Sequence, residues 1–153
     1  MKVSGRSIAL AVAGAALAAG VLAAPATADA SQANVGTSAA ITVHTRGDGT
    51  QPPAELGNPK EWGVVELKMD DSAGSVRPMT IIEVGGGTWS YGWNAVTGGK
   101  YCYSNYYHGS VQHGSTVKIA GDSLKSVVVA GETSNAHLTR GAAYTCETYY
   151  AKY

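Results

Sequence analysis

Apolar and polar residues alternate in short runs through the second half of the chain, which is the pattern of half-buried β-strands. In the run GTWSYGW, this alternation places Trp89, Tyr91 and Trp93 on one face of the predicted strand. In the run YCYSNYY, Cys102 and Tyr106 point to one side. The other tyrosines of that run point to the opposite side, and they are Tyr101, Tyr103 and Tyr107. The pattern therefore predicts strands with aromatic side chains on both faces.

Three further runs, STVKIA, LKSVVVA and AAYTCETYY, have the same character and are separated by the polar segments GDS and GETSNAHLTRG. No segment shows a sustained helical period. Short strands at this spacing are typical of an antiparallel sandwich or barrel. We therefore expect residues 85–153 to form an all-β module.

The first 28 residues have the pattern of a secretory signal peptide. Lys2 and Arg6 precede an uncharged, alanine-rich run, and small residues form a cleavage motif that ends at Ala28. This run is short for a bilayer, and no other stretch is apolar enough to span a membrane. We expect a secreted protein whose mature chain begins at Asp29 and has no transmembrane segment.

Residues 29–84 differ in composition from the rest of the chain. They carry eight acidic and four basic residues, whereas residues 85–153 carry three acidic and five basic residues and all nine tyrosines. Residues 30–58 are poor in large apolar side chains, so we expect a flexible acidic arm or a propeptide-like extension. The runs EWGVVELKM and RPMTIIEV predict two strands. They could form a hairpin over 61–84, pair with the second half, or be removed with a propeptide.

The two cysteines, Cys102 and Cys146, enter an oxidising compartment in a secreted protein. An even count without CxxC spacing predicts one disulfide rather than a zinc site. A closed loop of about 45 residues contributes roughly 4 kcal/mol in the chain-entropy model.

The segment YSNYYHGSVQHGS could hold a metal or catalytic site, an aromatic binding surface, or ordinary hairpin packing. Its histidines, His108 and His113, are five residues apart, which fits neither a helical zinc pair nor a finger. The chain has no GxSxG elbow, and its second half offers no matched pair of carboxylates. We therefore expect no metal, no cofactor and no enzymatic activity, with the histidines placed in a turn.

The aromatic residues favour a binding protein, because tyrosine and tryptophan suit half-wet surfaces that grip sugars, headgroups or another subunit. Nucleic acid is a poor fit, since residues 85–153 lack a cluster of Lys and Arg. The alternative is that many of these rings fill a core that contains no phenylalanine. The candidate ligand-binding residues are Trp89, Tyr91, Trp93, Tyr103, Tyr106, Tyr107 and His108.

The stretch GGGTWSYGWN…YSNYYHGSVQHGSTV resembles the lactococcin 972 family of secreted bacteriocins. The resemblance implies a small antiparallel β-sandwich of two three-stranded sheets, here with a flexible N-terminal arm, and a homodimer. It also implies killing of related Gram-positive bacteria by binding the cell-wall precursor lipid II and blocking septum formation. The two cysteines are absent from the family's founding member, and residues 29–84 are an extension.

Under this resemblance, the tyrosines would stack on the sugars of lipid II while His108 and Lys118 approach its anionic group. The partner would then be a cell-wall precursor or an envelope glycan of the target bacteria. A non-toxic secreted module that binds cell wall or polysaccharide through the same aromatic residues is the alternative function.

Overall fold

The computed structural model describes residues 40–68 and 79–153. The expected signal peptide at 1–28 and the first part of the expected arm lie outside these residues. Within the described ranges, none of the helical segments is long and apolar enough to cross a membrane.

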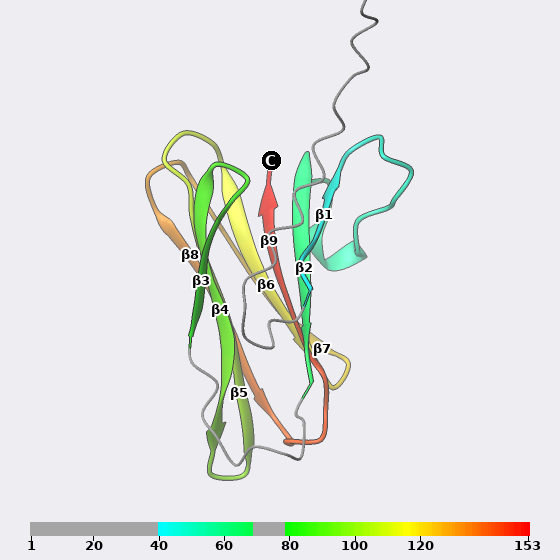
Figure 1. Cartoon of the computed structure of the whole chain (residues 1–153), viewed down its shortest axis with the longest axis vertical. Coiled ribbons are helices and arrows are strands. Elements are labelled where there is room, and N and C mark those ends of the chain that lie inside the picture. Colours follow the sequence, from blue (N-terminus) through cyan, green and yellow to red (C-terminus); the bar gives the residue numbers. More distant parts are fainter. Residues whose placement is uncertain (1–39, 69–78) are drawn as a thin grey trace, which may run out of the picture. The chain divides into compact units, whose positions relative to one another are not determined.

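Nine strands in residues 40–68 and 79–153 form two antiparallel sheets that lie face to face (Figure 1). The strands are β1 (Thr42–Thr45), β2 (Glu61–Leu67), β3 (Thr80–Val84), β4 (Gly87–Val96), β5 (Gly99–Tyr107), β6 (His113–Ile119), β7 (Asp122–Val128), β8 (Thr133–Arg140) and β9 (Cys146–Lys152). One sheet has the order β1-β2-β9-β6-β7 and the other has the order β3-β4-β5-β8. The predicted all-β, two-sheet architecture is confirmed.

The sheets are larger than the three-stranded pair that the resemblance implied. Residues 85–153 do contribute three strands to each sheet, namely β9-β6-β7 and β4-β5-β8. The additional strands β1, β2 and β3 come from residues 40–84, where an arm was expected. The prediction of two three-stranded sheets is therefore wrong for the whole chain, because the extension adds two strands to one sheet and one strand to the other.

The two strands of the extension do not form the hairpin expected over 61–84. β2 pairs with β9, in a register that runs from Glu61 opposite Lys152 to Leu67 opposite Cys146. β3 instead pairs with β4 in the other sheet. A tight turn joins β3 to β4, and its residues Gly85 and Gly86 have φ values of 62° and 81°, which favour glycine. Of the alternatives left open by the sequence, pairing with the second half is the one that the structure shows.

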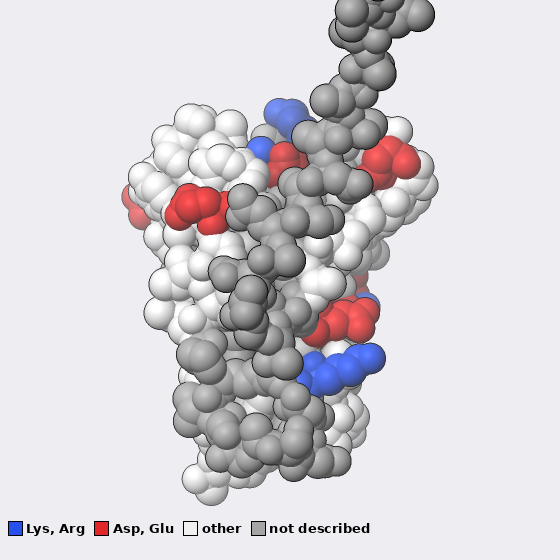
Figure 2. All heavy atoms as spheres, in the orientation of Figure 1, with Lys and Arg blue, Asp and Glu red and all other residues white. Residues whose placement is uncertain are grey.

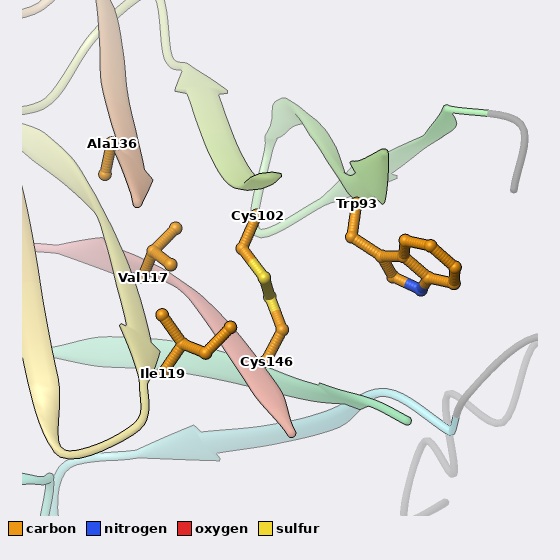
Figure 3. Packing of buried hydrophobic residues seen from close by; sticks show 6 residues of the cluster. All are labelled: Trp93, Cys102, Val117, Ile119, Ala136 and Cys146. Atoms are coloured by element: carbon orange, nitrogen blue, oxygen red, sulfur yellow. A yellow bond between two sulfur atoms is a disulfide. The ribbon is translucent and has the colours of Figure 1, made fainter. Parts of the chain in front are cut away.

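The core lies between the sheets, and a disulfide crosses it. Cys102 of β5 is bonded to Cys146 of β9, so the predicted pairing of the two cysteines is confirmed. Figure 3 shows this bond beside Val117 and Ile119 of β6. Both cysteines and both apolar side chains are buried. The bridge therefore joins one sheet to the other inside the apolar layer.

A third layer covers the outer side of the five-stranded sheet. This layer is the 46–60 segment, which contains a short 3-10 helix at Ala54–Leu56. Leu56 is fully buried in a cluster with Trp62, Tyr149 and Ala151. The Tyr153 hydroxyl donates to the Leu56 carbonyl at 2.9 Å. This part of the arm was expected to be flexible because it has few large apolar side chains. That expectation is wrong, because Leu56 packs against aromatic side chains of the sheet.

Candidate binding surface

Six of the seven predicted ligand-binding side chains are buried. Tyr107 is the exception, with 44% of its surface exposed. The buried residues are Trp89, Tyr91, Trp93, Tyr103, Tyr106 and His108. The expectation that this set forms a wet aromatic surface is therefore wrong, since most of these rings build the core of a chain without phenylalanine.

The polar atoms of two buried rings are satisfied inside the protein. The Trp89 indole nitrogen donates to the Ser104 hydroxyl at 2.9 Å, and that hydroxyl donates to the Tyr149 carbonyl at 2.8 Å. The Tyr106 hydroxyl donates to the Val84 carbonyl at 3.0 Å. Burial raises the pKa of Tyr106, and the carboxylates of Glu61 and Glu83 raise it further. The polar atoms of Trp89 and Tyr106 are therefore buried in the core and form hydrogen bonds there.

The two histidines fasten the loop between β5 and β6, as expected for residues of a turn. Nδ1 of His108 accepts from the backbone amides of Ser110 and Val111 at 3.2 and 3.3 Å, while its Nε2 lies 3.2 Å from the Gly85 carbonyl. In this arrangement His108 is a neutral ring with its proton on Nε2, because carbonyl oxygens only accept. Its hydrogen-bonding atoms are thus occupied by the backbone.

His113 is fully buried between two carbonyl oxygens. Its Nδ1 lies 2.8 Å from the Val111 oxygen, and its Nε2 lies 3.0 Å from the Glu132 oxygen. Both bonds form together only when both ring nitrogens carry a proton. Among the described residues, no group of three or more His, Cys, Asp and Glu side chains is arranged to hold a metal ion.

The anion contacts suggested for His108 and Lys118 do not come together. Lys118 forms an ion pair with Glu55 of the 46–60 segment, with 3.2 Å between nitrogen and oxygen. His108 instead contacts the β3–β4 turn and its own loop. Figure 2 shows that the described charged residues on the drawn face lie in small groups of both signs rather than in one basic patch.

Another polar chain of contacts joins the extension to the C-terminal strand. Glu61 accepts from the Tyr150 hydroxyl at 2.9 Å and forms an ion pair with Lys152 at 2.9 Å. Lys152 also donates to the Gly85 carbonyl at 2.7 Å, which is the oxygen that faces His108. The extension is therefore joined to β9 through side chains as well as through the sheet.

The outward-pointing positions of β4, β5 and β8 carry two of the predicted ligand-binding residues, Tyr103 and Tyr107, together with exposed residues that sequence reasoning missed. We call this surface the outer face. In its central row the register places Gly92 beside Tyr103 and Tyr103 beside His137. The ring of Tyr101 in the neighbouring row is 6.1 Å from that of Tyr103 and 5.4 Å from that of His137, between centroids. The other outward residues are Thr88, Ser90, Asn94, Asn105, Tyr107, Thr133, Asn135 and Thr139.

Tyr103 lies against its own sheet because its neighbour has no side chain. A Cβ atom at Gly92 would be 2.6 Å from the Tyr103 hydroxyl oxygen. The phenol ring therefore covers the β4 backbone and is buried although it points outward. Burial raises the pKa of Tyr103, and the neighbouring Tyr101 adds to the effect.

The two sheets, the disulfide between them and the aromatic core define a small all-β domain, and its outer face carries amides, hydroxyls and rings. The family model described as Bacteriocin (Lactococcin_972) matches residues 85–150. These residues are therefore similar to that bacteriocin family, as their resemblance predicted. Neither the curated proteins nor the solved structures gave a match. The match leaves out β1, β2 and β3.

Proposed function

We propose that this protein is a secreted bacteriocin that acts on the envelope of related Gram-positive bacteria. In this proposal it binds the cell-wall precursor lipid II, blocks septum formation and works as a homodimer. The observation that carries the proposal is the family match over residues 85–150. Those residues supply three strands to each sheet, so the family domain is the centre of the fold.

A binding mechanism is consistent with the chemistry of the described residues. The buried histidines hold loop carbonyls and amides, and the Trp89 indole and the Tyr106 phenol have internal partners. The signal-peptide pattern at residues 1–28 supports delivery outside the cell. Growth inhibition would then follow from occupancy of an envelope component rather than from turnover.

The test is a growth-inhibition assay with the purified, disulfide-bonded protein on related Gram-positive bacteria, followed by microscopy of dividing cells. The proposal expects inhibition with missing or incomplete septa, and retention of the protein by immobilised lipid II. Sedimentation at several concentrations tests the dimer. Normal growth and division at saturating protein would contradict the proposal.

A non-toxic secreted module that binds cell-wall polysaccharide is the second candidate. The uncharged composition of the outer face favours it, because amides, hydroxyls and aromatic rings are the groups that bind sugars. Retention on purified cell walls without growth inhibition would support this candidate over the bacteriocin.

A further inference from the structure

We infer that the outer face binds the glycan strand of peptidoglycan and recognises its neutral sugar rings rather than a pyrophosphate. This inference rests on the proposed action at the cell envelope, and it names a sugar-binding surface in addition to the proposed binding of lipid II. It also moves the binding surface from the buried hairpin residues to the outward side of β4, β5 and β8.

The two sheets differ in what lies on their outward sides. On the five-stranded sheet, the 46–60 segment covers Tyr149 and Ala151 with the buried side chain of Leu56. On the four-stranded sheet, β8 presents four exposed side chains, which are Thr133, Asn135, His137 and Thr139. Tyr107 of β5 is also exposed. Among the described residues, the outer face is therefore a sheet surface with exposed side chains that a partner can reach.

The chemistry of the outer face fits a sugar. Tyr101, Tyr103 and His137 form a group of neighbouring rings, and the nonpolar face of a pyranose stacks on such rings. The next row supplies the amide groups of Asn105 and Asn135, which both donate and accept hydrogen bonds. Threonine hydroxyls lie at both ends of β8. Sugar hydroxyl and acetamido groups need this mixture of donors and acceptors.

The absence of positive charge on these rows argues against recognition of an anion. The outward positions of β4, β5 and β8 in the outer face carry no Lys, Arg, Asp or Glu. Two nearby cations have other partners: Lys100 donates to the Tyr144 carbonyl at 2.6 Å, and Arg140 pairs with Asp122 at 2.7 Å. A pyrophosphate would require charge-assisted donors. Glu83 of the neighbouring strand β3 adds a negative charge at the border, where it accepts from the Thr88 hydroxyl at 2.8 Å. A glycan strand, whose sugar backbone is uncharged, matches the uncharged rows of β4, β5 and β8 better than an anion does.

Gly92 leaves the space that the Tyr103 ring occupies, since a Cβ atom at this position would be 2.6 Å from the Tyr103 hydroxyl oxygen. The Tyr101 ring lies at an interplanar angle of 31° to that of Tyr103 and of 30° to that of His137. An extended sugar chain can contact neighbouring rings of this kind at the same time.

The experiment measures binding of chitohexaose, a soluble chain of N-acetylglucosamine, to the full-length mature protein by calorimetry. Tyr101→Ala and His137→Ala should each weaken binding by about tenfold, and the double variant should weaken it further. Tyr144→Ala is the matched control, because this tyrosine is exposed but lies outside the outer face. Its binding should equal that of the wild type. Near-ultraviolet circular dichroism should show that every variant is folded.

Addition of inorganic pyrophosphate should leave chitohexaose binding unchanged, and purified peptidoglycan should retain the wild type but not the double variant. Undetectable binding of the wild type to chitohexaose and to peptidoglycan would overturn the inference. Equal affinities of the wild type, Tyr101→Ala and His137→Ala would also overturn it. Growth inhibition without glycan binding contradicts this inference alone, whereas glycan binding without growth inhibition contradicts the bacteriocin proposal alone.

Discussion

Tyr106 and Tyr107 are neighbours in the chain but have opposite surroundings. Tyr106 points between the sheets, where its ring centroid is 4.8 Å from that of Tyr150 and 5.4 Å from that of His113. Tyr107 points outward and is 44% exposed. The alternation of a single strand therefore separates a core residue from a surface residue.

This difference predicts opposite effects of two alanine substitutions. Tyr106→Ala should lower the free energy of unfolding by about 3 to 5 kcal/mol, because it leaves a large cavity. Tyr107→Ala should change it by less than about 0.5 kcal/mol, as an exposed position does. Urea denaturation followed by tryptophan fluorescence measures both values. Similar stability losses in the two variants would contradict the assignment of the faces.

At the scale of the element, the packing of β2 against β9 requires a glycine at position 63. A Cβ atom at Gly63 would lie 2.2 Å from the Tyr150 ring, which is too close for any real contact. Tyr150 is fully buried and its hydroxyl donates to Glu61 of the same strand pair. The ring therefore occupies the space above the β2 backbone.

Gly63→Ala should lower the free energy of unfolding by about 1 to 3 kcal/mol or more, because the added methyl group displaces this ring. Gly109→Ala is the control, since its nearest neighbour would be the Tyr107 hydroxyl at an ordinary 3.6 Å. Chemical denaturation compares the two variants. In the first variant, limited proteolysis should also cut the extension earlier than in the wild type. Equal stability of both variants would mean that β2 does not depend on this close packing.

The strands β4 and β5 could be predicted because the alternation in GTWSYGW and YCYSNYY is a local signal. The strand β8 (Thr133–Arg140) was not predicted, because the polar segment GETSNAHLTRG was interpreted as a separator between strands. The pairing partners of β2 and β3 could not be predicted from the sequence. Two strands of a hairpin and two strands of different sheets show the same local pattern.

The alternation in the sequence placed Tyr101, Tyr103 and Tyr107 correctly on one face of β5. It could not decide which face meets water, because both faces of β5 carry tyrosines. His137 was missed because it lies in GETSNAHLTRG, which was not interpreted as a strand.

At the scale of the whole molecule, the disulfide links the two sheets across 44 positions of the chain. Replacing both cysteines by alanine should lower the free energy of unfolding by about 2 to 4 kcal/mol, because the unfolded chain gains conformational freedom. Thermal and urea unfolding of the double variant measures this effect. Wild-type protein treated with a reductant should behave like the variant, and identical stabilities with and without the bond would contradict the prediction.

The position of β9 determines when the protein can fold during its synthesis. β9 lies between β2 and β6 in the five-stranded sheet, and it is made after every other described strand. The hydrogen bond between Glu61 and Tyr150 can form only after Tyr150 has been synthesised, 89 residues after Glu61. Until then β1–β2 and β6–β7 have no strand to join them, and pairing over such separations is slow. The five-stranded sheet can therefore be completed only after β9 has been made, and the Cys102–Cys146 bond, which includes a β9 residue, must also form late.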